Sequence, residues 1–193
     1  MECGYVSRLR ELSLSRPVHH EPENKTTIAI PWIGENTRTF LDHLLAALER
    51  IKLRKHKWRI FLEKAGNDQG YLNRFSRLPN CHISGTGPEY IDSLICSQSA
   101  IIYGGYNSIV DVLSLCLPSL IIQRQMNDNE QQEHLNHLMK KACGSLFTLP
   151  EDCNENQLVK ILEKLTEQDN KITLDINLDG AEKAACYIAT LLD

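Results

Sequence analysis

The stretch 99-SAIIYGGYNSIVDVLSLCLPSLIIQRQMNDNEQQ-132 decides how this chain folds. Ser99 to Tyr103 is short and apolar and ends at Gly104-Gly105, which is typical of a buried parallel strand. The apolar residues after Ser108 recur at helical spacing until Leu117-Pro118, where the helix ends because proline has no amide hydrogen. Ser119 to Gln123 supplies the next strand. The stretch therefore predicts a strand–turn–helix–strand unit.

The glycine turn of this unit predicts a binding site for an anion. It lies between the carboxyl end of a strand and the first turn of a helix, where free backbone amides and the positive end of the helix dipole converge. Ser108 adds a hydroxyl at the same turn. A second polar segment, 127–131, also follows a strand, so it can reach the same edge of a parallel sheet.

The rest of the chain repeats the alternation of strands and helices. Periodicity predicts helices within 36–51, 89–94, 129–143, 154–168 and 179–192, and further strands at 26–33, 58–63, 80–84 and 145–149. Right-handed crossovers between parallel strands would place helices on both faces of the sheet. The predicted fold class is therefore α/β, a Rossmann-like, doubly wound parallel sheet of about six strands.

Gly104-Gly105-Tyr106-Asn107-Ser108, with Asp111 after it, Leu117-Pro118 and Glu130-Gln131, resembles the C-terminal domain of GT-B glycosyltransferases. The nearest likeness is to the family of the peptidoglycan N-acetylglucosaminyltransferase and related predicted glycosyltransferases. The resemblance implies one half of a GT-B fold that binds the donor, a UDP-sugar, without a separate cofactor. It covers most of the chain from about Ile28 onward.

The same resemblance assigns expected roles to individual residues. The diphosphate would be held by the turn, the ribose by the acidic residue one helical turn on, and the sugar by the polar residues after the next strand. These sets are Gly104, Gly105, Tyr106, Asn107 and Ser108 for the diphosphate, Asp111 for the ribose, and Asn127, Asp128, Glu130 and Gln131 for the sugar. The catalytic residues stay unknown, since in this fold the base usually lies in the other domain.

Two further segments, around Tyr90 and at the amino terminus, are similar to segments of the GT-B glycosyltransferases. Tyr90 and Ile91 lie in a segment similar to the family's base-binding segment, although both residues would equally serve as packing under the sheet. Cys3-Gly4-Tyr5-Val6 is similar to the string that joins the two halves of such enzymes, whereas from the residues alone it could be a frayed terminus. We therefore expect 1–25 to be an interdomain linker or lead-in and 26–193 the nucleotide-sugar-binding domain with its C-terminal helix.

Composition sets limits on the function. The chain has 193 residues and a net charge of −4, which argues against nucleic-acid binding. Its 7 cysteines form no Cys-x-x-Cys pair, which favours a reducing cytoplasm. No apolar run reaches the ~20 residues of a spanning helix, so any membrane contact is expected through the missing half. Glu130, His134 and His137 share a helix face, but GT-B enzymes need no bound metal, and we predict none here.

These features predict the donor-binding domain of an inverting, metal-independent glycosyltransferase. A chain of this length cannot hold both GT-B halves, so the acceptor site and catalysis would need a missing N-terminal domain or a separate subunit. The isolated chain is expected to transfer no hexosyl or N-acetylhexosaminyl group. Two alternatives stay open: a nucleotide-sugar 2-epimerase-like domain, which shares the fold, and a non-catalytic nucleotide-binding domain.

Overall fold

The computed structural model describes residues 4–9, 23–30, 34–51, 56–63, 69–124, 130–143, 146–167, 173–174 and 177–191. Asn127 and Asp128, two of the expected sugar ligands, and most of the expected lead-in lie outside these ranges. At Glu130 and Gln131 the structure describes the helical backbone but not the side chains.

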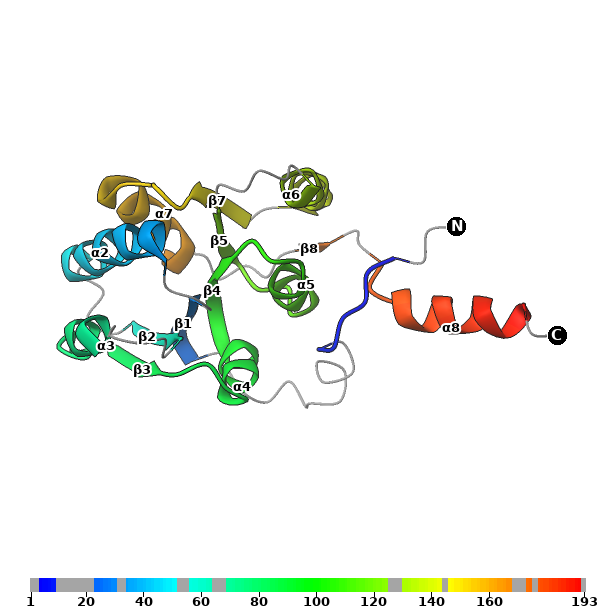
Figure 1. Ribbon diagram of the computed structural model, residues 1–193, viewed down its shortest axis with the longest axis horizontal. Coiled ribbons are helices and arrows are strands. Elements are labelled where there is room, and N and C mark those ends of the chain that lie inside the picture. The colour runs from blue at the N-terminus through cyan, green and yellow to red at the C-terminus, as the bar shows by residue number, and fades with distance from the viewer. Residues whose placement is uncertain are drawn as a thin grey trace.

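A six-stranded parallel sheet forms the centre of the fold, which confirms the predicted class (Figure 1). Its strand order is β3-β2-β1-β4-β5-β7, and every neighbouring pair is parallel. The strands are β1 (Glu23–Ile30), β2 (Lys57–Leu62), β3 (Cys81–Ser84), β4 (Ser97–Tyr103), β5 (Ser119–Gln123) and β7 (Leu146–Pro150). A separate two-residue antiparallel pair joins β6 (Ala142–Cys143) to β8 (Thr173–Leu174), and the sequence did not predict it.

Helices cover both faces of the sheet. The helices are α2 (Glu35–Arg50), α3 (Gln69–Phe75), α4 (Glu89–Ile95), α5 (Tyr106–Ser114), α6 (Glu130–Lys141), α7 (Glu155–Glu167) and α8 (Gly180–Thr190). Figure 1 shows α2, α3 and α7 on one side of the strands and α4, α5 and α6 on the other. Strand β4 serves both cores: Ile101 and Tyr103 pack with the first set, whereas Ala100 and Ile102 pack with the second. This alternation follows from the two-residue period of a strand.

Local sequence signals explain where two of the helices begin and end. A capping box opens α7, because the Asn154 side chain accepts from the Gln157 amide at 3.1 Å and the Gln157 side chain accepts from the Asn154 amide at 2.9 Å. The carboxyl end of α5 is a Schellman turn, in which the Cys116 amide donates to Leu113 and the Leu117 amide to Val112, both at 2.9 Å. Cys116 occupies the left-handed position of that turn, with φ of 50°.

The strand order reverses between β1 and β4. From β1 the chain proceeds outward to β2 and β3, and it then returns to β4 and continues outward to β5 and β7 on the other side. The helices that follow β1 and β4, α2 and α5, therefore lie on opposite sides of the sheet (Figure 1). Open α/β sheets bind ligands at such a switch point, and the loop after β4 is Gly104-Gly105.

The amino-terminal segment 4–9 is attached to the start of α8. The Tyr5 amide donates to the Asn177 carbonyl at 2.9 Å, and the Gly180 amide donates to the Tyr5 carbonyl at 3.0 Å. A Cβ at Gly180 would lie 2.7 Å from the carbonyl oxygens of Gly4 and Tyr5, so the close approach requires glycine there. Beyond this contact α8 extends away from the sheet (Figure 1).

Candidate functional site

The glycine turn lies between the end of β4 and the start of α5, as the sequence predicts. Gly105 is the N-cap of α5, with φ of −73° and ψ of 141°, and no side chain caps the helix. The Gly105 amide itself donates to the Tyr103 carbonyl at 2.8 Å, so the free donors are the amides of the first turn that follows. A Cβ at Gly105 would meet nothing within 4 Å, whereas one at Gly104 would lie 3.4 Å from the Ile122 carbonyl oxygen. The space beside Gly105 is therefore open to a ligand.

The side chains of the first turn of α5 take different environments. Tyr106 is 45% exposed and stacks on Tyr5, with ring centroids 6.1 Å apart and an interplanar angle of 29°. Asn107 is exposed and Ser108 is half-buried. The Tyr106 ring thus packs against the amino-terminal segment, and its backbone amide is the group that the diphosphate prediction would use.

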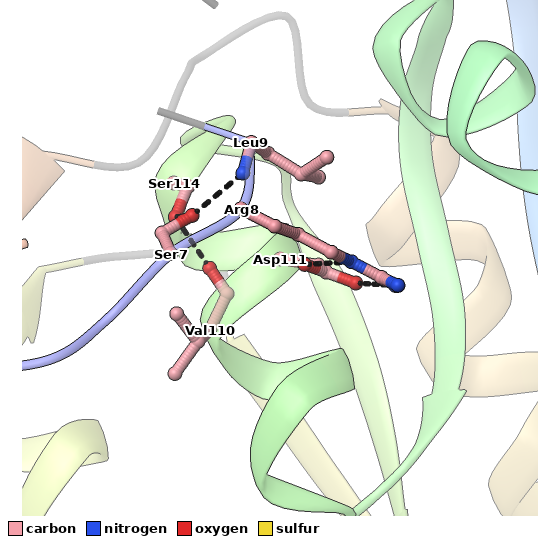
Figure 2. Close-up of polar contacts among 6 residues, drawn as sticks. All are labelled: Ser7, Arg8, Leu9, Val110, Asp111 and Ser114. Atoms are coloured by element: carbon pink, nitrogen blue, oxygen red, sulfur yellow. Dashed lines mark hydrogen bonds and ion pairs between the residues drawn. The ribbon is translucent and has the colours of Figure 1, made fainter. Parts of the chain in front are cut away.

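Asp111, the predicted ribose ligand, forms an ion pair with Arg8. Arg8 Nε lies 3.2 Å from Asp111 Oδ1, and Arg8 Nη2 lies 2.6 Å from Oδ2 (Figure 2). The Asp111 side chain is 2% exposed and the Arg8 side chain 60%. The hydrogen bond to Asp111 raises the pKa of Arg8 above its ordinary value. The sequence did not single out Arg8 as part of the site.

The predicted base-binding residues of α4 lie close to this pair. Burial raises the pKa of the Tyr90 hydroxyl, and the charge of Asp111 adds to the effect. The Tyr90 ring packs edge-on against Phe61, with centroids 5.6 Å apart. The Ile91 amide is 3.3 Å from the Pro88 carbonyl, to which it donates within the first turn of α4. The fold therefore gathers residues predicted for base, diphosphate and ribose into one region.

The predicted sugar ligands cannot be placed to the same degree. Glu130 and Gln131 begin α6, which follows β5 at the same edge of the sheet as the glycine turn. Their side chains, and all of Asn127 and Asp128, lie outside what the structure describes. Their role stays a prediction.

The sequence does not predict a buried polar cluster that lies at this edge of the sheet. Glu151, directly after β7, is 4% exposed, and its Oε1 accepts hydrogen bonds from Thr37 at 2.8 Å and Tyr103 at 3.1 Å. A single Glu after a strand carries no sequence signal of burial, so only the sheet order reveals this contact. Within the described part of the chain, no group of three or more His, Cys, Asp and Glu residues could hold a metal ion. No described helix is long and apolar enough to cross a bilayer.

Known proteins resemble this chain in structure but not in sequence. Its sequence matches no protein-family profile and no curated protein. MurG of Acinetobacter baumannii superposes with a TM-score of 0.60 at 12% identity, over 92% of this chain and 48% of MurG. A protein assigned as a UDP-N-acetylglucosamine 2-epimerase, from Listeria monocytogenes, superposes with a TM-score of 0.62 at 11% identity, over 98% of this chain and 49% of that protein. Arabidopsis thaliana UGT89C1, solved with UDP-L-rhamnose, superposes with a TM-score of 0.53 at 15% identity, over 84% of this chain and 38% of UGT89C1.

These likenesses establish the fold. The chain spans about half or less of each of these solved structures while most of its own length is matched. Its fold is that of one Rossmann-like half of a GT-B protein, the architecture of glycosyltransferases such as MurG.

Proposed function

We propose that this chain is the C-terminal, donor-binding half of an inverting, metal-independent glycosyltransferase. The observation that carries the proposal is the amino end of α5: an uncapped helix start at the switch point of the sheet, with open space beside Gly105. Such a helix start favours a negatively charged group. The donor that fits is a nucleoside diphosphate sugar, here a UDP-sugar.

The chemistry follows from the charge that develops during transfer. When the bond between the sugar and the diphosphate breaks, negative charge grows on the departing phosphate. Without a metal, that charge is stabilised by the amides of Tyr106, Asn107 and Ser108, by the Ser108 hydroxyl and by the helix dipole. Tyr90 and Ile91 would border the base, and Asp111 the ribose. The sugar would contact Asn127, Asp128, Glu130 and Gln131.

A second domain or subunit would complete the enzyme. The outer side of α8 exposes three large apolar side chains, Tyr187 at 44%, Ile188 at 57% and Leu191 at 66%. An exposed apolar surface of this kind is typical of a contact with another protein part. In this proposal α8 packs against the acceptor-binding half, which also supplies the general base. Any membrane contact would come through that half.

Calorimetric titration tests the donor site. UDP, UDP-N-acetylglucosamine and dTDP are titrated into the folded chain, at protein concentrations that would detect millimolar affinity. Heat of binding with UDP and its sugar supports the proposal. Absence of heat with all three ligands would rule out a donor site.

Activity assays separate the proposed function from its alternatives. The purified chain alone should transfer no sugar to a lipid or saccharide acceptor, because in this proposal the acceptor site and the general base belong to the missing half. Turnover by the chain alone would contradict the half-enzyme interpretation. The likeness to the Listeria monocytogenes protein keeps 2-epimerisation as the second candidate. Conversion of UDP-N-acetylglucosamine to its 2-epimer by the chain with its missing half would favour that activity instead.

A further inference from the structure

The carboxylate that borders the proposed ribose position is covered by a side chain of its own protein. Both oxygens of Asp111 accept from the Arg8 guanidinium, at 3.2 Å from Nε and 2.6 Å from Nη2. Only 2% of the Asp111 side chain reaches solvent, whereas 60% of Arg8 does. A ligand that approaches Asp111 therefore meets the guanidinium first.

The residues on either side of Arg8 hold it in this position (Figure 2). Ser7 Oγ lies 2.5 Å from Ser114 Oγ, in the last turn of α5, and accepts from the Leu9 amide at 3.1 Å. Leu9 is 1% exposed. Further along the segment, Tyr5 is bonded through its backbone to Asn177 and Gly180. The ion pair is thus one contact of an anchored segment.

Ribose hydroxyls are weak competitors for this carboxylate. A bidentate guanidinium–carboxylate pair combines two charge-assisted hydrogen bonds, which are about twice as strong as bonds between neutral groups. The 2′- and 3′-hydroxyls would replace a cation with two neutral donors. The exchange would lose electrostatic attraction in a site where the carboxylate is almost fully desolvated.

We propose that Arg8 is a specificity-determining residue, which keeps the site from recognising the ribose hydroxyls through Asp111. With Arg8 in place, a nucleotide is held by its diphosphate and base, and ribose and dideoxyribose nucleotides bind alike. Discrimination appears when the guanidinium is absent from Asp111. This inference rests on the proposed donor site and specifies which parts of the nucleotide that site recognises.

The test compares the affinities of UDP and 2′,3′-dideoxy-UDP by calorimetry. The wild-type chain should bind the two ligands within about twofold of each other. Arg8→Ala should bind UDP about tenfold more tightly than the dideoxy analogue. Hydrogen bonds from the ribose hydroxyls to the uncovered Asp111 carboxylate would increase the affinity for UDP by about this factor. Arg8→Met, which keeps the aliphatic stem, serves the same purpose should Arg8→Ala fail to fold.

Two control variants isolate the ion pair. Arg74→Ala removes an exposed ion pair between α3 and Asp42 of α2 but leaves Ser7, Arg8 and Asp111 intact, so it should behave as wild type. Arg8→Ala combined with Asp111→Asn removes both charges, and the preference for UDP should fall back to about that of wild type.

Each remaining outcome has a distinct meaning. A wild-type chain that already prefers UDP about tenfold, or an Arg8→Ala chain that gains no preference, overturns the role of Arg8 while the donor site stands. Failure of every folded variant to bind either nucleotide overturns the donor site and this inference together.

Discussion

Thr37 donates its hydroxyl to Glu151 over 2.8 Å and thereby joins the first turn of α2 to the residue that follows β7. The same carboxylate oxygen accepts from Tyr103, the last residue of β4, at 3.1 Å. Burial and the neighbouring charge of Glu151 raise the pKa of the Tyr103 hydroxyl, which therefore stays protonated and able to donate. Three elements are thus tied together at the edge of the sheet that carries the proposed site.

Removal of the Tyr103 hydroxyl should weaken this connection measurably. We expect Tyr103→Phe to lower the free energy of unfolding by about 0.5–1.5 kcal/mol, the usual contribution of one hydrogen bond. Tyr187→Phe on the exposed side of α8 is the matched control and should stay within about 0.5 kcal/mol of wild type. Urea denaturation measures both variants. Equal stability of Tyr103→Phe and wild type would show that the bond contributes nothing.

The left-handed residue after α5 offers a stabilising substitution. Cys116 has φ of 50°, a conformation that costs an L-residue about 1 kcal/mol and glycine almost nothing. We expect Cys116→Gly to raise the melting temperature by about 2–4 °C for a chain of this size. Cys96, the C-cap of α4, has φ of −93°, so Cys96→Gly should give no such gain. A similar response of both variants in thermal unfolding would contradict the strain argument.

A buried histidine should make the stability of the fold depend on pH. His56 is 3% exposed, and burial lowers its pKa to about 4 from its ordinary 6.5. Between these two values the unfolded chain binds the proton and the folded chain does not. This group therefore lowers the free energy of unfolding as pH falls through the window, by at most about 1.4 kcal/mol per pH unit.

Substitution of His56 isolates that contribution. His56→Gln should flatten the fall in stability between pH 6.5 and pH 4, the window set by the two pKa values. His82→Gln, at an exposed histidine of β3, should leave the pH dependence unchanged. Denaturant titrations at several pH values supply the curves. A parallel pH dependence of His56→Gln and wild type would rule out His56 as the source.

The sequence predicts most of the sheet because its strands are short apolar runs bounded by turn residues. β5 spans Ser119–Gln123, as predicted. β4 begins at Ser97, which pairs with Glu23 of β1, rather than at Ser99. Ser97 Oγ lies 2.7 Å from Thr27 Oγ1, and Ser99 Oγ lies 2.6 Å from Thr26 Oγ1. Serine and threonine residues whose hydroxyls pair inside a sheet still count as polar in a sequence pattern. Hydrophobic patterning alone therefore predicts a strand that begins two residues after the observed start of β4.

The parts of the site that the sequence did not predict depend on contacts between distant residues. Arg8 and Asp111 are 103 positions apart, and Thr37 and Glu151 are 114 apart. Local patterns predict the glycine turn and the helix that follows it, because these are set by neighbouring residues. Which side chain covers a carboxylate depends on how segment 4–9 packs on α5, and no periodicity encodes that packing.

The conformation of Gly105 allows its role in binding to be separated from its role in the fold. Its φ of −73° is open to any residue, and an added Cβ would meet no atom within 4 Å. We therefore expect Gly105→Ala to melt within a few degrees of wild type, while its methyl group occupies the space proposed for the diphosphate and weakens UDP binding at least about tenfold. Gly70→Ala, also with no atom within 4 Å but on α3, is the control and should bind UDP as wild type does. The reverse pattern, a destabilised Gly105→Ala chain whose folded fraction binds UDP normally, would make the glycine pair a structural turn and move the donor site elsewhere.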